Sequence, residues 1–188
     1  MKLNKIIYCG AMLLVFASCN DFLEQPPKDL LSSNGFYQTT AQANQGVLGI
    51  YADLRYLVEY EYNEMSEYRS DNVWSGPTPN GQRDCSDISN FRAGSELGTF
   101  ESAWDSWYKV IYDANTAISK LSGATFQNAT VQAQLLNEAH FLRGWAYFEL
   151  VRLFGNVPVV LEPSSPTTVN AIAQTDGKTI LTTIVIPE

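Results

Sequence analysis

Long stretches of apolar residues at helical spacing constrain this chain more than any other feature of its sequence. The strongest lies between Thr130 and Gly155, where apolar residues recur every three or four positions and so share one helical face. Its stripe consists of Val131, Leu135, Ala139, Leu142, Ala146, Leu150 and Leu153, widened on one flank by Phe141, Trp145 and Phe148. Thr130 can cap its start, Gly155 is a natural stop, and Pro158 prevents continuation. We therefore predict a long amphipathic helix that ends at Gly155.

Two earlier stretches show the same period. One predicts a helix over residues 41–59, capped by Thr39 or Thr40, with an apolar face of Ala43, Val47, Ile50, Tyr51, Leu54 and Val58. The other predicts a helix over residues 100–121, with a face of Phe100, Trp104, Trp107, Tyr108, Ile111, Ala114, Ile118 and Leu121. Because of their place on the stripes, Trp104, Trp107 and Trp145 are expected in the core. Long helices joined by a short connection form antiparallel pairs, which predicts a mainly α fold whose exposed stripes need neighbours.

The region between the first two helices, residues 60–99, lacks this period. Its prolines and glycines favour turns and loops. The aromatic residues Tyr60, Tyr62, Tyr68, Trp74 and Phe91 argue against disorder. A long irregular segment inside a compact chain is usually either functional or disordered. We therefore expect a loop-rich segment that carries the function.

The N-terminus has the features of a lipoprotein leader. Lys2 and Lys5 precede an apolar run from Ile6 to Phe16, which is too short to span a bilayer. A pair of small residues then precedes Cys19, the position at which a lipoprotein is cleaved and acylated. We predict that Cys19 is lipidated, because several acyl chains together hold a protein at a membrane. The alternative is an ordinary signal peptide followed by a chance cysteine.

Charge and composition exclude several classes of function. A net charge of −8 without a basic run argues against nucleic acid and against electrostatic binding to anionic lipid. His140 is the single histidine and Cys85 has no cysteine partner in the mature chain, so we predict no metal site, no catalytic triad and no cofactor. The acids between Glu59 and Asp71 do not single out the pair that a glycosidase needs. We therefore predict a protein without enzymatic activity.

The end of the chain follows a different pattern. A short strand is expected from Val157 to Leu161, and residues 163–178 have the composition of a loop. Residues 179–186 form a β-prone apolar run that stops without a partner strand. From the sequence we expect a truncated or frame-shifted product.

Residues 137–158, NEAHFLRGWAYFELVRLFGNVP, closely resemble the hallmark of the SusD/RagB family of nutrient-binding proteins. The start of the mature chain from Cys19 to Pro27, the Phe36-Tyr37 pair, and the spacing of Trp104, Tyr108, Ile111 and Asn115 resemble the family too. The resemblance covers Cys19 to about Leu161, the N-terminal portion of such a protein. It suggests four parts, namely a signal peptide (1–18), a lipidated tether (19–40), a helical domain (41–161) and an atypical tail (162–188).

The resemblance implies a lipid-anchored protein of the outer membrane, exposed at the cell surface and built on tetratricopeptide-like helix pairs. Its members capture glycans without cleaving them and cover a SusC-like TonB-dependent transporter. Such a chain would bind a polysaccharide or oligosaccharide and hand it to that transporter. The alternative is a structural or protein-interaction helical module of the transporter complex that binds no sugar.

The family places part of its glycan site in the loop region, which here contains both kinds of side chain that sugars need. Sugar rings present apolar C–H faces that pack on aromatic planes, and their hydroxyls need polar partners. We predict Trp74 as the aromatic platform, with Asp71 and Arg83 as hydroxyl partners. The alternative is that Trp74 packs the loops together and Asp71 caps a turn.

Overall fold

The computed structural model describes residues 36–59, 61–73, 83–126, 128–164 and 171–188, without the side chains of Arg83 and Asp84. Residues from Tyr37 onward form one unit. Its elements, in chain order, are α3 (Thr40–Glu59), α4 (Glu61–Met65), the 3₁₀ turn η2 (Glu67–Arg69), α5 (Arg83–Ser89), α6 (Gly98–Gly123), α7 (Ala129–Phe154), β1 (Val157–Pro158), β2 (Gln174–Thr175), α9 (Gly177–Ile180) and the π-helix η3 (Leu181–Val185). The architecture is mainly α, as predicted.

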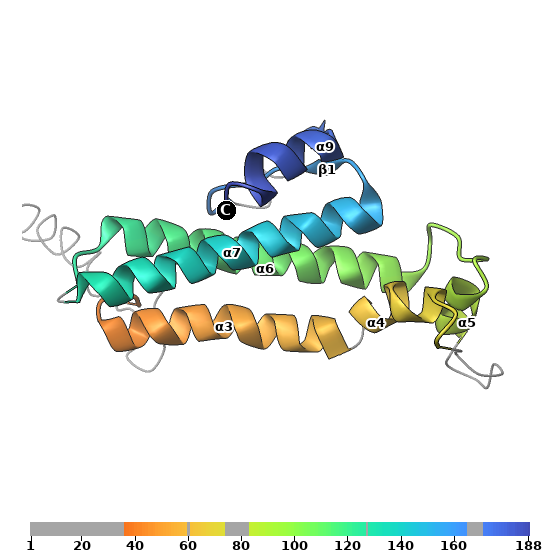
Figure 1. Cartoon of the computed structure of the whole chain (residues 1–188), viewed down its shortest axis with the longest axis horizontal. Helices are drawn as coiled ribbons and strands as arrows, with labels where there is room; N and C mark the ends of the chain where they lie inside the picture. The colour runs from red at the N-terminus through yellow and green to blue at the C-terminus, as the bar shows by residue number, and fades with distance from the viewer. Residues whose placement is uncertain (1–35, 60, 74–82, 127, 165–170) are drawn as a thin grey trace, which may run out of the picture. The chain divides into compact units, whose positions relative to one another are not determined.

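Three long helices form the body of the unit (Figure 1). α6 runs antiparallel to both α3 and α7 and packs against both of them, and residues 124–128 connect α6 to α7. The side chains between these helices are the predicted stripes, including Val47, Ile50, Leu54, Trp107, Ile111, Leu121, Leu135, Leu142 and Leu150. This confirms the tetratricopeptide-like antiparallel arrangement.

The helix ends follow local side-chain chemistry. Thr39 Oγ1 accepts a hydrogen bond from the Gln42 amide at 3.2 Å, and Gln42 Oε1 accepts one from the Thr39 amide at 3.1 Å. This reciprocal pair confirms the expected cap of the first helix. For α7, however, the cap is Asn128 and not Thr130, because Asn128 Oδ1 accepts from the amides of Thr130 and Val131, each at 3.1 Å. Gly155 ends α7 with φ 77°, as predicted.

The predicted stripes were wider than the surfaces that the neighbouring helices cover. Trp107 is fully buried, whereas Trp104 and Trp145 are only half-buried. On α3, Tyr51 and Val58 are exposed, and Leu57 takes the buried position instead. On α7, Phe141 and Phe148 are exposed, with 61% and 42% of their surfaces open. The predicted core was therefore too large on the flanks of α3 and α7.

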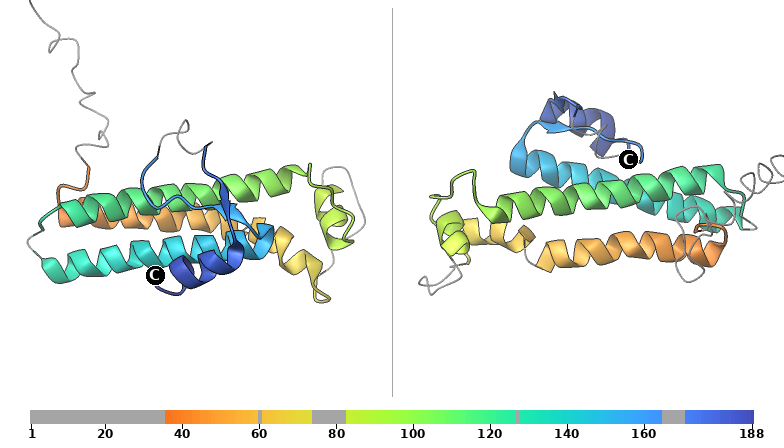
Figure 2. Two further views of the ribbon diagram at one scale, coloured as in Figure 1. Left: turned by 90° about the horizontal axis from the view of Figure 1, so that it is seen from above. Right: turned by 180° about the vertical axis from the view of Figure 1, so that it is seen from behind.

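The prediction of a β-prone run at residues 179–186 was wrong, because residues 177–185 are helical and residue 186 lies in a turn. Asp176 Oδ2 accepts from the Thr179 amide at 3.1 Å and so caps the segment. Ile180 and Ile184 are buried, where α9 and η3 pack on α7. Figures 1 and 2 show α9 and η3 along α7, on the side away from α3. Tertiary burial of one face outweighs the strand preference of the Thr and Ile residues.

A small sheet precedes this helical end. β1 pairs antiparallel with β2, with Val157 opposite Thr175 and Pro158 opposite Gln174. The predicted strand over residues 157–161 is therefore shorter than expected, and residues 174 and 175 of the predicted loop supply its partner. Among the described residues, no helix combines the length and apolar character needed to cross a membrane.

Candidate functional site

The described parts of the segment between α3 and α6 contain more helix than the sequence predicted. They include α4, η2 and α5, which have five, three and seven residues. Helices this short cannot display a convincing apolar period. Met65 of α4 and Ile88 of α5 are buried, which anchors the segment to the body.

Polar contacts fix the segment against the long helices. Glu64 of α4 accepts hydrogen bonds from Cys85 Sγ at 3.5 Å and from Thr99 Oγ1 at 3.2 Å, so it connects α4 to α5 and to the start of α6. From α7, Arg152 donates to Ser66 Oγ at 2.8 Å and lies 5.5 Å from the ring centre of Tyr62. The carboxylate of Glu149 holds Arg152 in place, with Nε to Oε2 at 2.8 Å. The last turns of α7 therefore position the irregular segment.

Among the described aromatic residues of this segment, Phe91 is the most exposed. Its side chain is 70% exposed, and its backbone has φ 54°, in the left-handed region that bulky residues rarely adopt. The Phe91 amide donates to the Ile88 carbonyl at 3.1 Å and the Arg92 amide to the Asp87 carbonyl at 2.7 Å, which turns the chain at the end of α5. A strained residue with an exposed aromatic ring is a reason to suspect a functional role.

A pocket of about 220 Å³ lies beside this ring, lined by Arg69, Ile88, Phe91, Ala93 and Phe100. The Arg69 guanidinium carbon lies 5.4 Å from the Phe91 ring centre, a cation–π distance. Arg69 comes from η2 and Phe91 from the turn after α5. Two parts of the irregular segment therefore place a charged donor beside an aromatic plane.

Further polar side chains follow Arg69 directly. Ser70 Oγ donates to the Glu67 carbonyl at 2.8 Å and accepts from the Asn72 amide at 3.3 Å, which forms a tight turn. Asp71 and Asn72 lie exposed in that turn. Asp71, two residues after Arg69, thus has a carboxylate open to a ligand hydroxyl.

The predicted roles of Asp71, Trp74 and Arg83 stay predictions. Asp71 is exposed. Trp74 lies outside the described residues, as does Cys19, and Arg83 is described only by its backbone, as the first residue of α5. Sequence reasoning did not select Arg69 or Phe91. The sequence feature that could have pointed to Phe91 is its place between the polar residues Asn90 and Arg92, outside any helical stripe.

Two other pockets are lined mainly by hydrocarbon and aromatic side chains. One, of about 260 Å³, is lined by Trp104, Asp105, Tyr108, Ile111, Tyr112, Pro158, Val160 and Ser164. The Tyr108 hydroxyl donates to the Pro158 carbonyl at 2.7 Å, and burial raises the pKa of Tyr108. The other, of about 330 Å³, is lined by Phe141, Gly144, Trp145, Phe148, Val185 and Glu188. Exposed rings lie in both, Tyr112 in the first and Phe141 in the second.

Among the described acids of the segment, Glu61 is the buried one. Its Oε2 atom is the buried side-chain polar atom that lacks a hydrogen-bond partner in the described part of the chain. Burial raises the pKa of Glu61, and the nearby negative charge of Glu64 raises it further. Within the described residues, no group of three or more His, Cys, Asp and Glu side chains could hold a metal ion.

Comparison with known proteins places this geometry in a family. The model of a SusD-like family, described as "Starch-binding associating with outer membrane", matches residues 21–183. The chain belongs to this SusD-like family. Two curated SusD-like proteins of Formosa agariphila are similar to it, P25 with 26% identity over 98% of the chain, and P38 with 32% identity over 77% of it. The chain spans 36% and 28% of their respective lengths, or about a third.

Solved structures of SusD-like proteins share the fold. A laminarin-binding SusD-like protein superimposes with a TM-score of 0.67 at 26% identity, over 79% of this chain and 32% of its own. A SusD homologue from Bacteroides thetaiotaomicron has a TM-score of 0.60 at 18% identity, over 84% of this chain and 30% of its own. The helical arrangement is therefore that of SusD-like proteins.

Proposed function

We propose that this SusD-like chain contributes to the non-catalytic capture of glycans, and that the Arg69–Phe91 pocket forms part of the binding site. The observation that carries this proposal is the exposed ring of Phe91, which lies beside the Arg69 guanidinium on a residue with a left-handed backbone. The predicted residues Asp71, Trp74 and Arg83 belong to the same stretch of sequence, and we propose that they extend the site.

The chemistry of the pocket suits a sugar. An aromatic plane packs against the C–H face of a pyranose ring, and the open part of the Phe91 ring offers such a plane. A guanidinium offers several hydrogen-bond donors and no acceptor, and a carboxylate offers only acceptors. Arg69 and Asp71 can therefore bind sugar hydroxyls in complementary ways around one ring.

The relatives suggest which sugars to test first. The family description names starch, and one structural relative is named for laminarin. Both are glucans, so we propose a glucan as the ligand class.

Affinity electrophoresis in gels that contain starch, laminarin or no polysaccharide tests the proposal. We expect one glucan to retard the wild-type chain and Phe91→Ala to weaken that retardation about tenfold, the scale of a lost aromatic stacking contact. Phe141→Ala is the matched control, because Phe141 is a similarly exposed phenylalanine on α7. Equal retardation of wild type and Phe91→Ala by a glucan would remove Phe91 from the site.

The same gels test the residues selected from sequence. Trp74→Ala, Asp71→Ala and Arg83→Ala should each reduce retardation if the site extends along the segment. A loss in Phe91→Ala alone would restrict the site to the Arg69–Phe91 pocket.

We further propose that the protein is a lipid-anchored, surface-exposed outer-membrane protein that hands oligosaccharides to a SusC-like TonB-dependent transporter. The family description of association with the outer membrane supports this proposal, as does the leader predicted to end before Cys19. Co-purification of the tagged chain with a membrane transporter from detergent extracts would test the partnership.

The second candidate function is a protein-interaction module. The exposed rings of Phe141 and Phe148 on α7 favour it, because exposed aromatic side chains along one helix are typical of protein interfaces. Loss of the transporter partner in Phe141→Ala, with no glucan bound by any variant, would favour this second function.

A further inference from the structure

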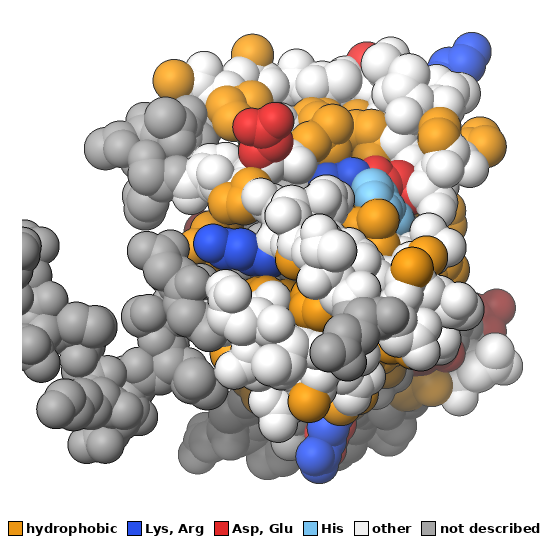
Figure 3. Space-filling view, turned by 90° about the vertical axis from the view of Figure 1, so that its left-hand side faces the viewer, with side chains coloured by type: hydrophobic (Ala, Val, Ile, Leu, Met, Phe, Trp, Pro, Cys, Tyr) orange, Lys and Arg blue, Asp and Glu red, His pale blue; other side chains and the backbone are white. Residues whose placement is uncertain are grey.

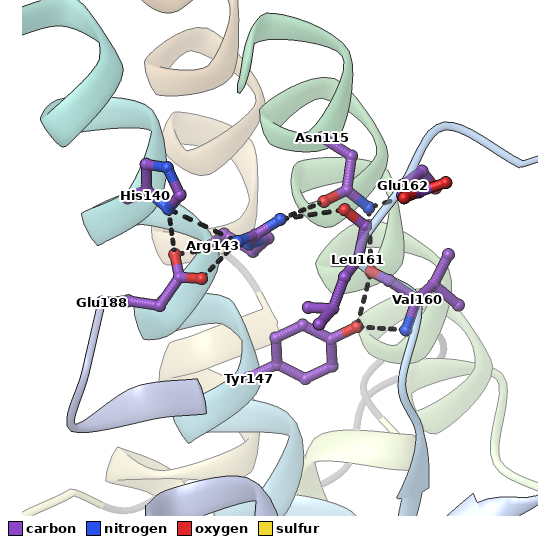
Figure 4. A network of polar contacts seen from close by, with 8 residues as sticks. All are labelled: Asn115, His140, Arg143, Tyr147, Val160, Leu161, Glu162 and Glu188. Atoms are coloured by element: carbon purple, nitrogen blue, oxygen red, sulfur yellow. Dashed lines mark hydrogen bonds and ion pairs between the residues drawn. The ribbon is translucent and has the colours of Figure 1, made fainter. Parts of the chain in front are cut away.

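Arg143 of α7 has a buried guanidinium that a network of polar contacts holds in place (Figure 4). Its side chain is only 7% exposed. Arg143 Nη1 donates to Asn115 Oδ1 of α6 at 2.8 Å and to the Leu161 carbonyl at 3.1 Å. Asn115 is itself buried and donates to the Val160 carbonyl at 2.8 Å. Contacts from α6 and from the segment after β1 therefore fix the orientation of the guanidinium.

The other guanidinium nitrogens meet the carboxylate of Glu188. Arg143 Nη2 forms an ion pair with Glu188 Oε1, and Arg143 Nε donates to Glu188 Oε2 at 3.3 Å. His140, one turn earlier on α7, places Nδ1 2.9 Å from Glu188 Oε2. This is a two-pronged arginine–carboxylate contact with a third nitrogen beside it. Figure 3 shows the histidine at the surface, beside acidic and basic side chains and among hydrophobic ones.

Gly144 leaves the space that this contact needs. A Cβ atom at Gly144 would lie 3.0 Å from Glu188 Cβ and 3.7 Å from the Val185 carbonyl oxygen. The first distance is tighter than ordinary van der Waals contact. The glycine therefore lets the end of residues 177–188 approach the backbone of α7.

Glu188 continues the spacing of the buried apolar residues of its own segment. Ile180 and Ile184 are buried against α7, and Glu188 follows at the same four-residue spacing. The π-turn of η3, closed by the Ile186 amide on the Leu181 carbonyl at 3.1 Å, adds a residue to one turn. This extra residue moves Glu188 back towards the face that carries the two isoleucines.

We propose that Arg143, oriented by Asn115, forms with His140 a receptor for a side-chain carboxylate, and that Glu188 fills it. The receptor selects an acidic residue four positions after Ile184 and so fixes the register in which residues 177–188 dock on α7. The two isoleucines supply apolar burial, which is non-directional. The carboxylate fixes the docking position along α7, because a bidentate arginine–carboxylate contact tolerates little displacement.

Hydrogen exchange of the full chain tests this proposal, with Glu188→Gln compared with wild type. The amide side chain keeps the size of the acid but removes the charge, which leaves the buried Arg143 guanidinium without its counter-ion. We expect amides of residues 177–188 to exchange about tenfold faster in this variant, because local opening becomes easier. Glu162→Gln is the control, since it removes an exposed acid from the neighbouring segment and should leave this exchange unchanged.

The amides of α3 serve as an internal reference, because α3 lies on the other side of the unit. Faster exchange in residues 177–188 with unchanged exchange in α3 supports a local receptor. Unchanged exchange in residues 177–188 overturns the proposal, and so does an equal acceleration in α3, since the carboxylate would then act on the whole unit.

A second variant tests the receptor by adding a free carboxylate. Glu188→Ala vacates the site, so sodium acetate should raise the Tm of this variant more than sodium chloride of equal ionic strength does. The wild-type chain should show no such difference, because Glu188 already fills the receptor. An equal acetate effect on both chains would contradict a carboxylate-specific site.

Discussion

The Tyr147 hydroxyl forms hydrogen bonds with both backbone groups of Val160. It accepts from the Val160 amide at 2.6 Å and donates to the Val160 carbonyl at 2.9 Å. Burial raises the pKa of Tyr147 to about 12, so the hydroxyl keeps its proton at neutral pH and can donate. One side chain of α7 thereby forms hydrogen bonds with both backbone polar groups of a buried residue after β1.

Tyr147→Phe should therefore destabilise the chain by about 1–3 kcal/mol, because it leaves a buried amide without its partner. Urea unfolding followed by circular dichroism measures this change. Tyr112→Phe is the matched control, since Tyr112 is exposed and should change stability by less than about 0.5 kcal/mol. Equal stability of both variants would mean that water replaces the Tyr147 hydroxyl.

Adjacent residues on α7 should respond very differently to truncation. Leu142 is fully buried and Phe141 is mostly exposed. Leu142→Ala should cost about 2–5 kcal/mol through lost burial and a cavity, whereas Phe141→Ala should cost less than about 1 kcal/mol. Thermal unfolding of the two variants checks the order. A larger loss in Phe141→Ala would show that a second surface covers α7 in solution.

Glu61 should make the free energy of unfolding depend on pH. Burial, with the charge of Glu64, raises the pKa of Glu61 in the folded chain above its unfolded value. The protonated acid therefore favours folding, and its contribution is complete below the unfolded pKa and is lost as pH rises through the folded pKa.

Glu61→Gln mimics the protonated acid, so it should stabilise the chain by about 1 kcal/mol at pH 8 and have a smaller effect at pH 4. Urea unfolding at both pH values measures the difference. Glu67→Gln, which changes an exposed acid nearby, should show no comparable pH-dependent gain. An equal gain in stability for Glu61→Gln at both pH values would contradict a raised pKa of Glu61 in the folded chain.

The left-handed backbone at Phe91 can be tested separately from its ring. Phe91→Gly and Phe91→Ala both remove the aromatic side chain, but only glycine adopts φ 54° without strain. Phe91→Gly should therefore be more stable than Phe91→Ala by about 1 kcal/mol in thermal unfolding. Both variants should lose glucan retardation to the same extent.

Lipidation at Cys19 is open to direct chemical test. Metabolic labelling with a fatty acid should tag the wild-type chain and not Cys19→Ala, because an acyl chain needs the thiol or the amine of a processed cysteine. Cys85→Ala should be labelled like wild type. Labelling that persists in Cys19→Ala would rule out this residue as the anchor.

The long helices, the cap of α3 and the end of α7 could be read from the sequence because their determinants are local. The apolar period, the Thr39 cap and the Gly155 stop each depend on residues within a few positions of one another. The irregular segment could also be recognised as the region of the candidate site. Its key residues could not, because Arg69 and Phe91 are brought together by turns that carry no periodic signal.

Tertiary structure alone decided the conformation of residues 177–185 and the partner of Arg143. The sequence of residues 179–186 favours a strand, yet burial of Ile180 and Ile184 against α7 accompanies a helical conformation up to Val185. Arg143 and Glu188 are 45 residues apart, and only the packed helices bring their charges together. Sequence determines structure directly where neighbouring residues interact, whereas contacts between distant residues depend on which surfaces remain uncovered once the helices have packed.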